Sequence, residues 1–234
     1  MLRAAFGGEP PIPVSERAAM LASFETQLAA LNQAIAQAPR EGPLYSRRGD
    51  RLLFLGRFAE AVADFEKMIA LDLANDAPHW RLGIAYYFNG QFAKSARQFE
   101  KYHAYDDRDR ENGLWKFLGD VRGRSLEAAR DAMLFYSRFD REPFPTLYAL
   151  FEGKLTTSAF FADLKQRELD GEPRVMFFAH YYAGLHEEVL GRRAQAIAYL
   201  REAVANPWGR TAENGPAYMW QVARLHYEKL LAEK

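Results

Sequence analysis

The sequence predicts an all-α protein built as a solenoid of helical hairpins, and two observations carry this prediction. First, residues 42–109 contain one 34-residue pattern that occurs twice, and eleven positions of the first copy recur in the second. These are Arg47, Gly49, Phe54, Gly56, Phe58, Ala59, Phe65, Glu66, Lys67, Ala70 and Asp72. Second, apolar residues recur at spacings of three and four, the period of an amphipathic helix. A repeat of this length with two helical halves indicates a stack of helix pairs.

The composition provides enough apolar residues for a substantial core and no net charge. Of the 234 residues, 49% are hydrophobic and 14% aromatic, and 31 basic residues balance 31 acidic ones. This balance argues against a nucleic-acid-binding protein, which carries a basic excess. The absence of cysteine excludes disulfides, thiolate nucleophiles and cysteine-based zinc sites. No cofactor is expected, because no phosphate-binding loop, dinucleotide-binding fingerprint or serine-elbow motif occurs.

Residues 1–13 are rich in Pro and Gly and are predicted to be a disordered lead-in to a single solenoid over 14–234. They lack the continuous apolar region of a signal peptide. They are therefore either an ordinary flexible terminus or, given the small residues around Ala4 and Gly7, what lies beside a signal cleavage site. No apolar run of 18 or more residues occurs, so no membrane span is expected.

The first helix is predicted from Ser15, a favourable N-cap residue, to about Gln37. Its apolar residues follow the helical period on one face, at Leu21, Phe24, Leu28, Leu31 and Ile35. A single apolar stripe must be buried against a neighbour. We therefore interpret 14–41 as a half repeat that packs on the first full repeat.

Two full repeats follow, at 42–75 and 76–109. A glycine in the first helix of each repeat, Gly49 or Gly83, removes the side chain where the second helix crosses. The two helix axes can then approach closely. A second glycine, Gly56 or Gly90, is expected to end the first helix, because glycine adopts the left-handed conformation without penalty.

A third, degenerate repeat is predicted at 112–141. Its first helix is expected to be several residues short, and its second helix to run from Leu126 to about Asp140. The charged run before it, 105–111, is expected to be a solvent-exposed turn. Pro143 then breaks the helix, because a proline ring clashes with the preceding turn and offers no N–H.

The C-terminal third of the chain completes the array. Two short helices are predicted within 146–170, the second of them capped by Thr156. A last full repeat is predicted at 177–206, where a helix pair again carries small residues at regular spacing. After a loop at 207–215, a capping helix is expected at 216–231, with one apolar and one polar face.

A 34-residue helical pair with these residues resembles the tetratricopeptide repeat (TPR) family. The first copy carries the resemblance at Tyr45, Gly49, Gly56, Ala61 and Phe65, and the second at Trp80, Leu82, Gly83, Gly90 and Phe99. The resemblance implies a right-handed superhelix, in which Phe65 and Phe99 can fill the space between neighbouring helix pairs. Some positions depart from the family pattern, at Arg48, Met68, Leu73, Tyr102 and Asp107.

The whole layout over roughly 42–228 resembles the NlpI-type bacterial TPR lipoproteins, and similar layouts occur in TPR proteins of photosynthetic organelles. The likeness is strongest in RLGIAYYFNGQFAKSARQFEKYHAYDDRD, LFEGKLTTSAFFADL and AHYYAGLHEEVLGRRAQAIAYLREAVANP. The resemblance implies an export-linked, often dimeric adaptor that holds enzymes together. It favours a soluble protein in a periplasmic or exported location over a cytoplasmic one. The lipobox cysteine of that family is absent from this chain.

In TPR solenoids one face of each first helix lines a concave groove, and the resemblance assigns the partner-binding residues to that face. They are Asp50, Leu53, Trp80, Arg81, Ile84, Tyr87, Phe88, Lys116, Phe178, Tyr181 and Glu188. Trp80 and Tyr87 are expected to be exposed, where such aromatic residues form interface hot spots. Phe54 and Phe88 are equally compatible with packing between repeats.

The expected partner is a protein or peptide segment, and the expected function is a non-enzymatic scaffold or adaptor. A TPR clamp for carboxylate tails needs Lys and Asn at two positions of the first helix, and only Lys116 fits, so an apolar or mixed peptide is favoured. Arg47 and Arg81 either pair with an acidic partner or bridge to Asp50 or to glutamates of neighbouring helices. The alternative is a homodimeric structural or assembly factor that pairs through its first or last helix.

One cluster hints at catalysis, at His180, His186, Glu187 and Glu188. A metalloprotease zinc site uses two histidines four residues apart on one helical face. These histidines are six apart, which separates them by about 120° around the helix. Helix packing is therefore the favoured role, and no catalytic or metal-binding residue is expected. A metal-dependent enzyme that uses this cluster is the weaker alternative.

Overall fold

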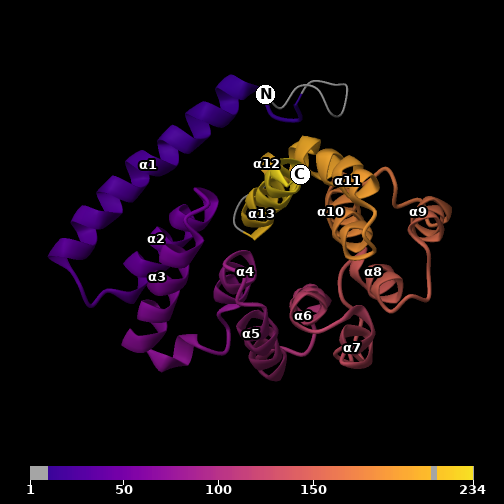
Figure 1. The fold of residues 1–234 in the computed structure, drawn as a ribbon, viewed down its shortest axis with the longest axis horizontal. Helices are drawn as coiled ribbons and strands as arrows, with labels where there is room; N and C mark the ends of the chain where they lie inside the picture. Colours follow the sequence, from indigo (N-terminus) through magenta and orange to yellow (C-terminus); the bar gives the residue numbers. More distant parts are fainter. Residues whose placement is uncertain (1–9, 212–214, 234) are drawn as a thin grey trace. The chain divides into compact units, whose positions relative to one another are not determined.

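The structure is a computed structural model that describes residues 10–211 and 215–233. Within these ranges it contains thirteen α-helices, one 3-10 turn and no strand, which confirms the all-α prediction (Figure 1). The chain forms two compact units. Unit 1 combines Arg141–Lys234 with the residues up to Ala18, and unit 2 spans Ala19–Asp140.

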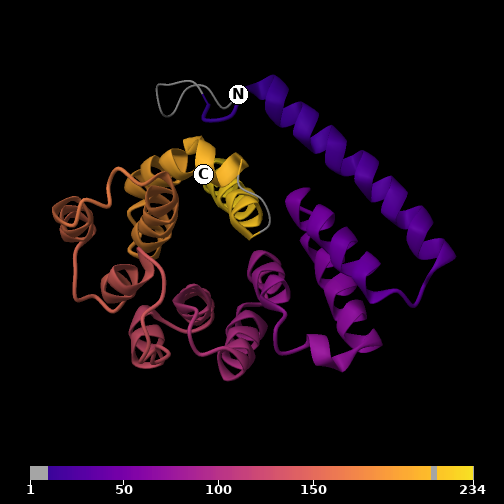
Figure 2. The ribbon, with the colours of Figure 1, turned by 180° about the vertical axis from the view of Figure 1, so that it is seen from behind.

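Unit 2 is a succession of helices that pack in chain order. It contains most of α1 (Val14–Gln37), then α2 (Gly42–Phe54), α3 (Phe58–Leu71), the 3-10 turn (Leu73–Asn75), α4 (Trp80–Phe88), α5 (Phe92–Tyr105), α6 (Arg110–Gly123) and α7 (Leu126–Asp131). Each helix from α2 to α7 packs against the next, and Figure 2 shows the same order from behind. The two predicted full repeats therefore each contain one pair of packed helices.

The glycines inside α2 and α4 sit where the second helix of each pair crosses. A Cβ added at Gly49 would lie 2.6 Å from Cε1 of Phe65, and one added at Gly83 would lie 2.6 Å from Cε2 of Phe99. Both phenyl rings are fully buried. The turn glycines have left-handed φ angles of 78° and 73°, at Gly56 and Gly90. The predicted roles of all these glycines are confirmed.

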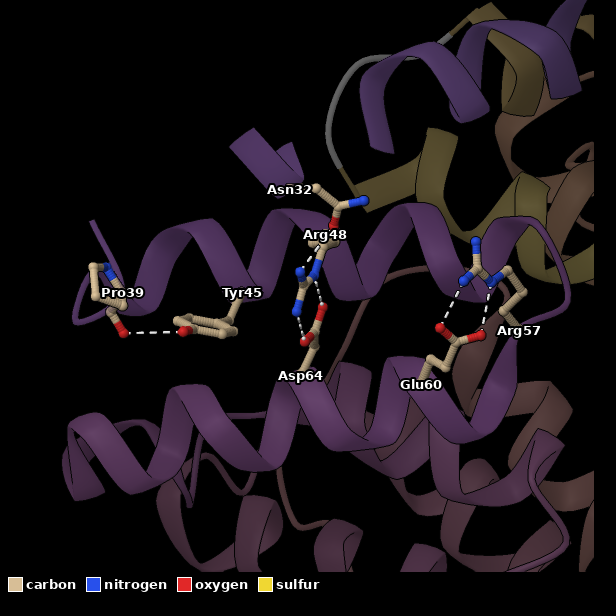
Figure 3. Close-up of polar contacts among 7 residues, drawn as sticks. All are labelled: Asn32, Pro39, Tyr45, Arg48, Arg57, Glu60 and Asp64. Carbon is tan, nitrogen blue, oxygen red and sulfur yellow. Dashed lines mark hydrogen bonds and ion pairs between the residues drawn. The ribbon is translucent and has the colours of Figure 1, made fainter. Parts of the chain in front are cut away.

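Arg48 joins α1, α2 and α3 (Figure 3). Its guanidinium donates to both carboxylate oxygens of Asp64 in α3, at 2.7 Å each, and to Oδ1 of Asn32 in α1, at 2.9 Å. One turn further along α2, Arg51 donates to Oε1 of Gln27 at 2.6 Å. These contacts confirm that the first helix packs on the first full repeat.

Helix α6 differs from the prediction for the third repeat. It is 14 residues long rather than short, because it begins at Arg110, inside the run 105–111 that the sequence predicted to be a turn. Asp109 explains this start, since its carboxylate accepts a hydrogen bond from the backbone N–H of Glu111 at 3.1 Å. An N-cap of this kind satisfies a donor that has no partner in the first helical turn.

Helix α7 ends at Asp131, so the prediction of a helix to Asp140 is wrong. Side chains of α6 hold the chain that follows α7 in a non-helical path by donating to its carbonyl groups. Lys116 donates to the carbonyl oxygen of Ala132 at 2.9 Å, and Arg110 donates to that of Tyr136 at 3.1 Å. Aromatic residues and serine also have a modest helix propensity.

Unit 1 contains the C-terminal helices. They are α8 (Phe144–Phe151), α9 (Thr157–Gln166), α10 (Pro173–Val189), α11 (Arg193–Ala205), α12 (Pro207–Thr211) and α13 (Gly215–Ala232). Helix α10 packs on α11, and α11 packs on α13. The predicted cap of α9 is confirmed, because Thr156 accepts a hydrogen bond from the backbone N–H of Ala159 at 3.1 Å.

Two boundaries in unit 1 correct the predictions. The last repeat begins four residues early, at Pro173, because a proline fits the first turn of a helix, where its missing N–H is not needed. The predicted loop at 207–215 contains the short helix α12. Residues 1–9 of the predicted lead-in, with Ala4 and Gly7, and residues 212–214 of the loop lie outside the described residues. Ile12, at the end of the lead-in, is buried.

Residues from both ends of the sequence meet in unit 1. Arg17, in the first turn of α1, donates to both carboxylate oxygens of Glu228 in α13, at 2.6 and 2.9 Å. Its neighbour Glu16 accepts from Arg210 of α12 at 2.9 Å. Side-chain contacts within unit 1 therefore join residues that lie 194 and 211 positions apart in the sequence.

Candidate interaction surface

Most of the predicted groove residues are part of the core of their own unit. Their exposed fractions run from 0% to 8%, and they are Asp50, Leu53, Ile84, Tyr87, Phe88, Lys116, Phe178 and Tyr181. Three predicted residues remain partly exposed, at Trp80, Arg81 and Glu188. Trp80 and Arg81 belong to α4 in unit 2, and Glu188 belongs to α10 in unit 1. The candidate surface therefore reduces to a small part of the predicted set.

Tyr87 is buried, so the prediction that it is exposed is wrong. Only 2% of the residue is accessible, because its ring packs edge-on against Phe92 and Trp115, with centroids 5.5 Å away in both cases. Phe88 stacks on Phe58 of α3 at 5.1 Å. Of the two roles left open for Phe88, the structure shows packing between repeats.

Lys116 is also internal. Its ammonium lies 2.6 Å from Oδ2 of Asp120 and donates to the carbonyl oxygen of Ala132, and only 4% of its side chain is exposed. In this conformation the ammonium is not presented at the surface. The one residue that fitted a carboxylate clamp is thus engaged within α6 and with the chain that follows α7.

Trp80, Arg81 and Asp50 form one contact between α2 and α4. Arg81 Nη1 lies 3.0 Å from Oδ2 of Asp50, and the guanidinium carbon lies 5.3 Å from the centre of the Trp80 ring. The Arg81 side chain is 37% exposed, whereas that of Asp50 is 12% exposed. A buried carboxylate therefore holds a partly exposed guanidinium against an indole. Of the two roles left open for Arg81, the bridge to Asp50 is confirmed.

The electrostatics of Asp50 follow from its burial. Burial raises the pKa of this carboxyl to about 6, although the nearby charges of Arg81 and Arg51 lower it. Its second oxygen, Oδ1, is buried and has no hydrogen-bond partner among the described residues. Within the described ranges, Arg81 is therefore the one residue that donates a direct hydrogen bond to the ionised Asp50 carboxylate, which makes the pair sensitive to pH.

Arg47 and Arg51 extend the positive charge along α2. Residues at i, i+3 and i+4 share a helix face, so Arg47, Asp50 and Arg51 lie on one side of α2. Arg51 is partly buried against Phe24, whereas Arg47 is exposed and pairs with no acidic residue among those described. The charges of Arg81 and Arg51 therefore act on the buried carboxyl of Asp50, and Arg47 adds an exposed guanidinium on the same side of α2.

The histidine cluster divides between two environments. His186 is buried, with Nδ1 3.4 Å from Oγ1 of Thr157, and Thr157 donates a short hydrogen bond to Glu187. His180 instead packs on the ring of Phe161 at 5.4 Å, and burial lowers the pKa of its imidazole. Within the described ranges, no three His, Asp or Glu side chains are grouped so that they could hold a metal ion. The observed contacts are those of helix packing.

Sequence reasoning did not single out the residues that follow α7. Tyr136 is 8% exposed and Asp140 contacts the first residue of α6, although both were expected on the second helix of a repeat. One signal was available. Four of the seven residues in 133–139, three aromatic residues and one serine, have a modest helix propensity, while the other three, Met133, Leu134 and Arg138, are strong helix formers.

No protein-family model matches this chain, and no match is found among curated proteins. In the part of the chain that the structure describes, no helix combines the length and apolar character needed to cross a membrane. The all-α fold therefore rests on the observed helices and their packing, and the family resemblance of the sequence stays a prediction.

Proposed function

We propose that this chain is a non-enzymatic, TPR-like scaffold that binds a peptide or protein segment on the face formed by α2 and α4. The contact among Asp50, Arg81 and Trp80 carries the proposal. It holds a hydrogen-bonding cation and an aromatic ring in fixed positions, which lowers the entropy lost on binding. Arg and Trp are also the residue types that most often dominate interface energies.

The charge of the face favours a segment of mixed character. Arg47, Arg51 and Arg81 outnumber Asp50, so a carboxylate on the partner is attracted, while Trp80 offers an apolar contact. A segment with both acidic and apolar side chains fits best. Such charge complementarity raises association rates and specificity more than it raises affinity.

A binding experiment with matched variants tests the proposal. The chain with Trp80→Ala and Arg81→Ala is compared with the wild type and with a Phe135→Ala and Arg138→Ala control, which likewise removes one aromatic residue and one arginine, but from a different exposed segment. A partner captured from source cells is purified, and its affinity is measured by calorimetry. The first variant is expected to bind at least about tenfold more weakly, a loss of roughly 1.4 kcal/mol, and the control to bind normally. Equal losses in both variants would refute the proposal.

The homodimeric alternative makes a different prediction. It uses the first or the last helix as the contact, yet the charges of Arg17 and Glu228 on these helices are already paired with each other in unit 1. Light scattering at two protein concentrations separates the two functions. A scaffold that acts as a monomer gives the chain mass of 26.8 kDa at both concentrations, whereas a dimer gives a larger mass that falls on dilution.

A further inference from the structure

Residues 132–140, called the strap below, take the place of the helix predicted after α7. From Met133 to Ser137 the strap has no helix, turn or strand. It nevertheless lies on α5 and α6, within unit 2, and several side chains hold it there. The chain has thus placed a non-helical segment of its own on a helical surface.

The inner side of the strap is bound through an aromatic ring, a carboxylate and two carbonyl groups. The Tyr136 ring packs edge-on against His103 of α5 at 4.7 Å and lies 5.3 Å from the guanidinium of Arg110. Arg110 also donates its backbone N–H to Oδ2 of Asp140 at 2.9 Å. A carboxylate at a helix N-terminus is favoured by the helix dipole. The Tyr136 and Ala132 carbonyls accept from Arg110 and Lys116.

The outer side of the strap has no such contacts. Phe135 is 81% exposed and Phe139 is 74% exposed, and both are among the most exposed large apolar residues of the described chain. Ser137 and Arg138, between them, are exposed as well. The outer side of the strap therefore buries little apolar surface, and segments with few buried contacts open locally at a free-energy cost well below that of global unfolding.

The strap also leaves part of its binding surface unsatisfied. Nη1 of Arg110 is buried and has no hydrogen-bond partner among the described residues, although Nη2 of the same guanidinium donates to the strap. A buried donor without an acceptor costs about 1–3 kcal/mol. A segment that supplies an acceptor to Nη1 would bind this surface more tightly than the strap does, contact for contact.

We propose that the surface of α5 and α6 around His103, Arg110 and Lys116 is a second docking site, for an extended protein segment with an aromatic residue and a carboxylate four positions later. The strap fills this site in cis. The partner segment displaces the strap, with its aromatic ring on His103 and its carboxylate at the N-terminus of α6. Because the strap competes as an intramolecular ligand at high effective concentration, it keeps the site closed to weak binders.

A peptide derived from the strap tests this proposal. The probe contains residues 132–140 with serine in place of both phenylalanines, and its twin also has alanine in place of the tyrosine. The chain with Tyr136→Ala and Asp140→Asn weakens the cis contacts, and a chain with Phe135→Ser and Phe139→Ser alters only the outer side. NMR titration follows backbone amide signals of α5 and α6 in both chains.

The probe is expected to bind the first chain at least about tenfold more tightly than it binds the wild type or the outer-side control, because the competing cis ligand is weakened. The alanine twin is expected to bind at least about tenfold more weakly than the probe, since the ring carries much of the contact. Equal binding of both peptides, or no binding to a first chain that retains its helical circular dichroism, would overturn the proposal.

Native-state proteolysis of the unmodified chain gives a second measurement that does not depend on the variants. Trypsin cleavage after Arg138 requires local release of the strap. If the strap is displaceable, cleavage occurs under native conditions at a rate that low denaturant concentrations hardly change, which indicates local opening. If cleavage after Arg138 appears only together with global unfolding, the strap is a fixed part of unit 2 and the proposal is wrong.

Discussion

Arg48 and Asp64 form an ion pair between α2 and α3 in which the side chains are 23% and 7% exposed. The corresponding residues of the second copy, 34 positions later, are Leu82 and Gln98, which carry no charge. Gln98 donates instead to the carbonyl oxygen of Asp76 at 2.6 Å. Both partners therefore change together between the copies, so neither copy leaves a charge unpaired at this crossing, where an unpaired buried charge would be costly.

The glycine contacts give the first prediction. Gly49→Ala is expected to destabilise the chain by about 1–3 kcal/mol, because its Cβ would overlap the fully buried Phe65 ring and overpacking costs more than the gain in helix propensity. Chemical denaturation checks this. Gly171→Ala, at a turn, is the control for adding a methyl group in open space, since no atom lies within 4 Å of an added Cβ there, and its effect is expected within about 0.5 kcal/mol. If Gly49→Ala does not change the stability, α2 and α3 are farther apart than the structure places them.

Asp50 gives a prediction about pH. Its folded-state pKa of about 6 lies above the ordinary value of 3.8, so the folded chain binds the proton more tightly than the unfolded chain. The stabilisation is complete below about pH 4 and is lost as the pH rises through about 6. Relative to Asp50→Asn, the wild type is expected to lose about 1–3 kcal/mol between these pH values. A difference between the two chains that does not change with pH would contradict this.

The comparison with Asp50→Asn is needed because His79 acts in the opposite direction. Burial lowers the pKa of His79 to about 4, and its Nδ1 accepts a hydrogen bond from the backbone N–H of Leu82 at 3.1 Å. The stability that neutral His79 contributes is present above about pH 6.5 and is lost as the pH falls toward 4. Both chains contain His79, so the difference between them isolates Asp50.

At the scale of the elements, the helices with the strongest local signals were predicted well. Apolar period, turn glycines and caps together locate α2 to α5, and Thr156 locates the start of α9. Helix α7 was predicted too long because its end depends on Lys116 and Arg110, whose contacts with carbonyl groups have no local signature in the sequence. Tertiary contacts of this kind override propensity.

The packing of these elements gives the next prediction. Phe65→Ala or Phe99→Ala is expected to cost about 3–5 kcal/mol, because each ring is fully buried against a glycine of the preceding helix. For a chain of this length, such a loss lowers the melting temperature by roughly 6–20 °C. Circular dichroism measures the change. Phe135→Ala, at an 81% exposed position, is expected to leave the melting temperature nearly unchanged, and tolerance of both core substitutions would disprove the repeat assignment.

At the scale of the whole molecule, the candidate surface was harder to predict than the helices. The repeat identified which positions of α4 face the same way, but it could not show which of them a neighbour covers. Tyr87 is covered by Trp115, which lies two helices later, whereas Trp80 remains partly exposed. Burial of this kind is set by non-local packing, and the same is true of the contacts between residues near both ends of the sequence.

The contact between Arg17 and Glu228 allows a test of this non-local closure of unit 1. Glu228 also lies 2.9 Å from Arg224, a residue that is 1% exposed. Glu228→Gln alone is therefore expected to cost more than Arg17→Gln alone, because it also removes the charge that faces the buried guanidinium of Arg224. Neither single value measures the contact itself, so a double-mutant cycle is required.

The coupling free energy between Arg17 and Glu228 is expected to be about 0.5–1 kcal/mol, near the upper end for an exposed pair, because the contact is bidentate but Arg17 is 44% exposed. Urea unfolding of the four chains at low salt provides the measurement, and added salt should reduce the coupling. Lys229 and Glu233, 3.9 Å apart and similarly exposed, serve as a control pair with an expected coupling of about 0–0.3 kcal/mol. Equal couplings in both pairs would mean that the contact between the two ends of the sequence contributes nothing specific to the stability of unit 1.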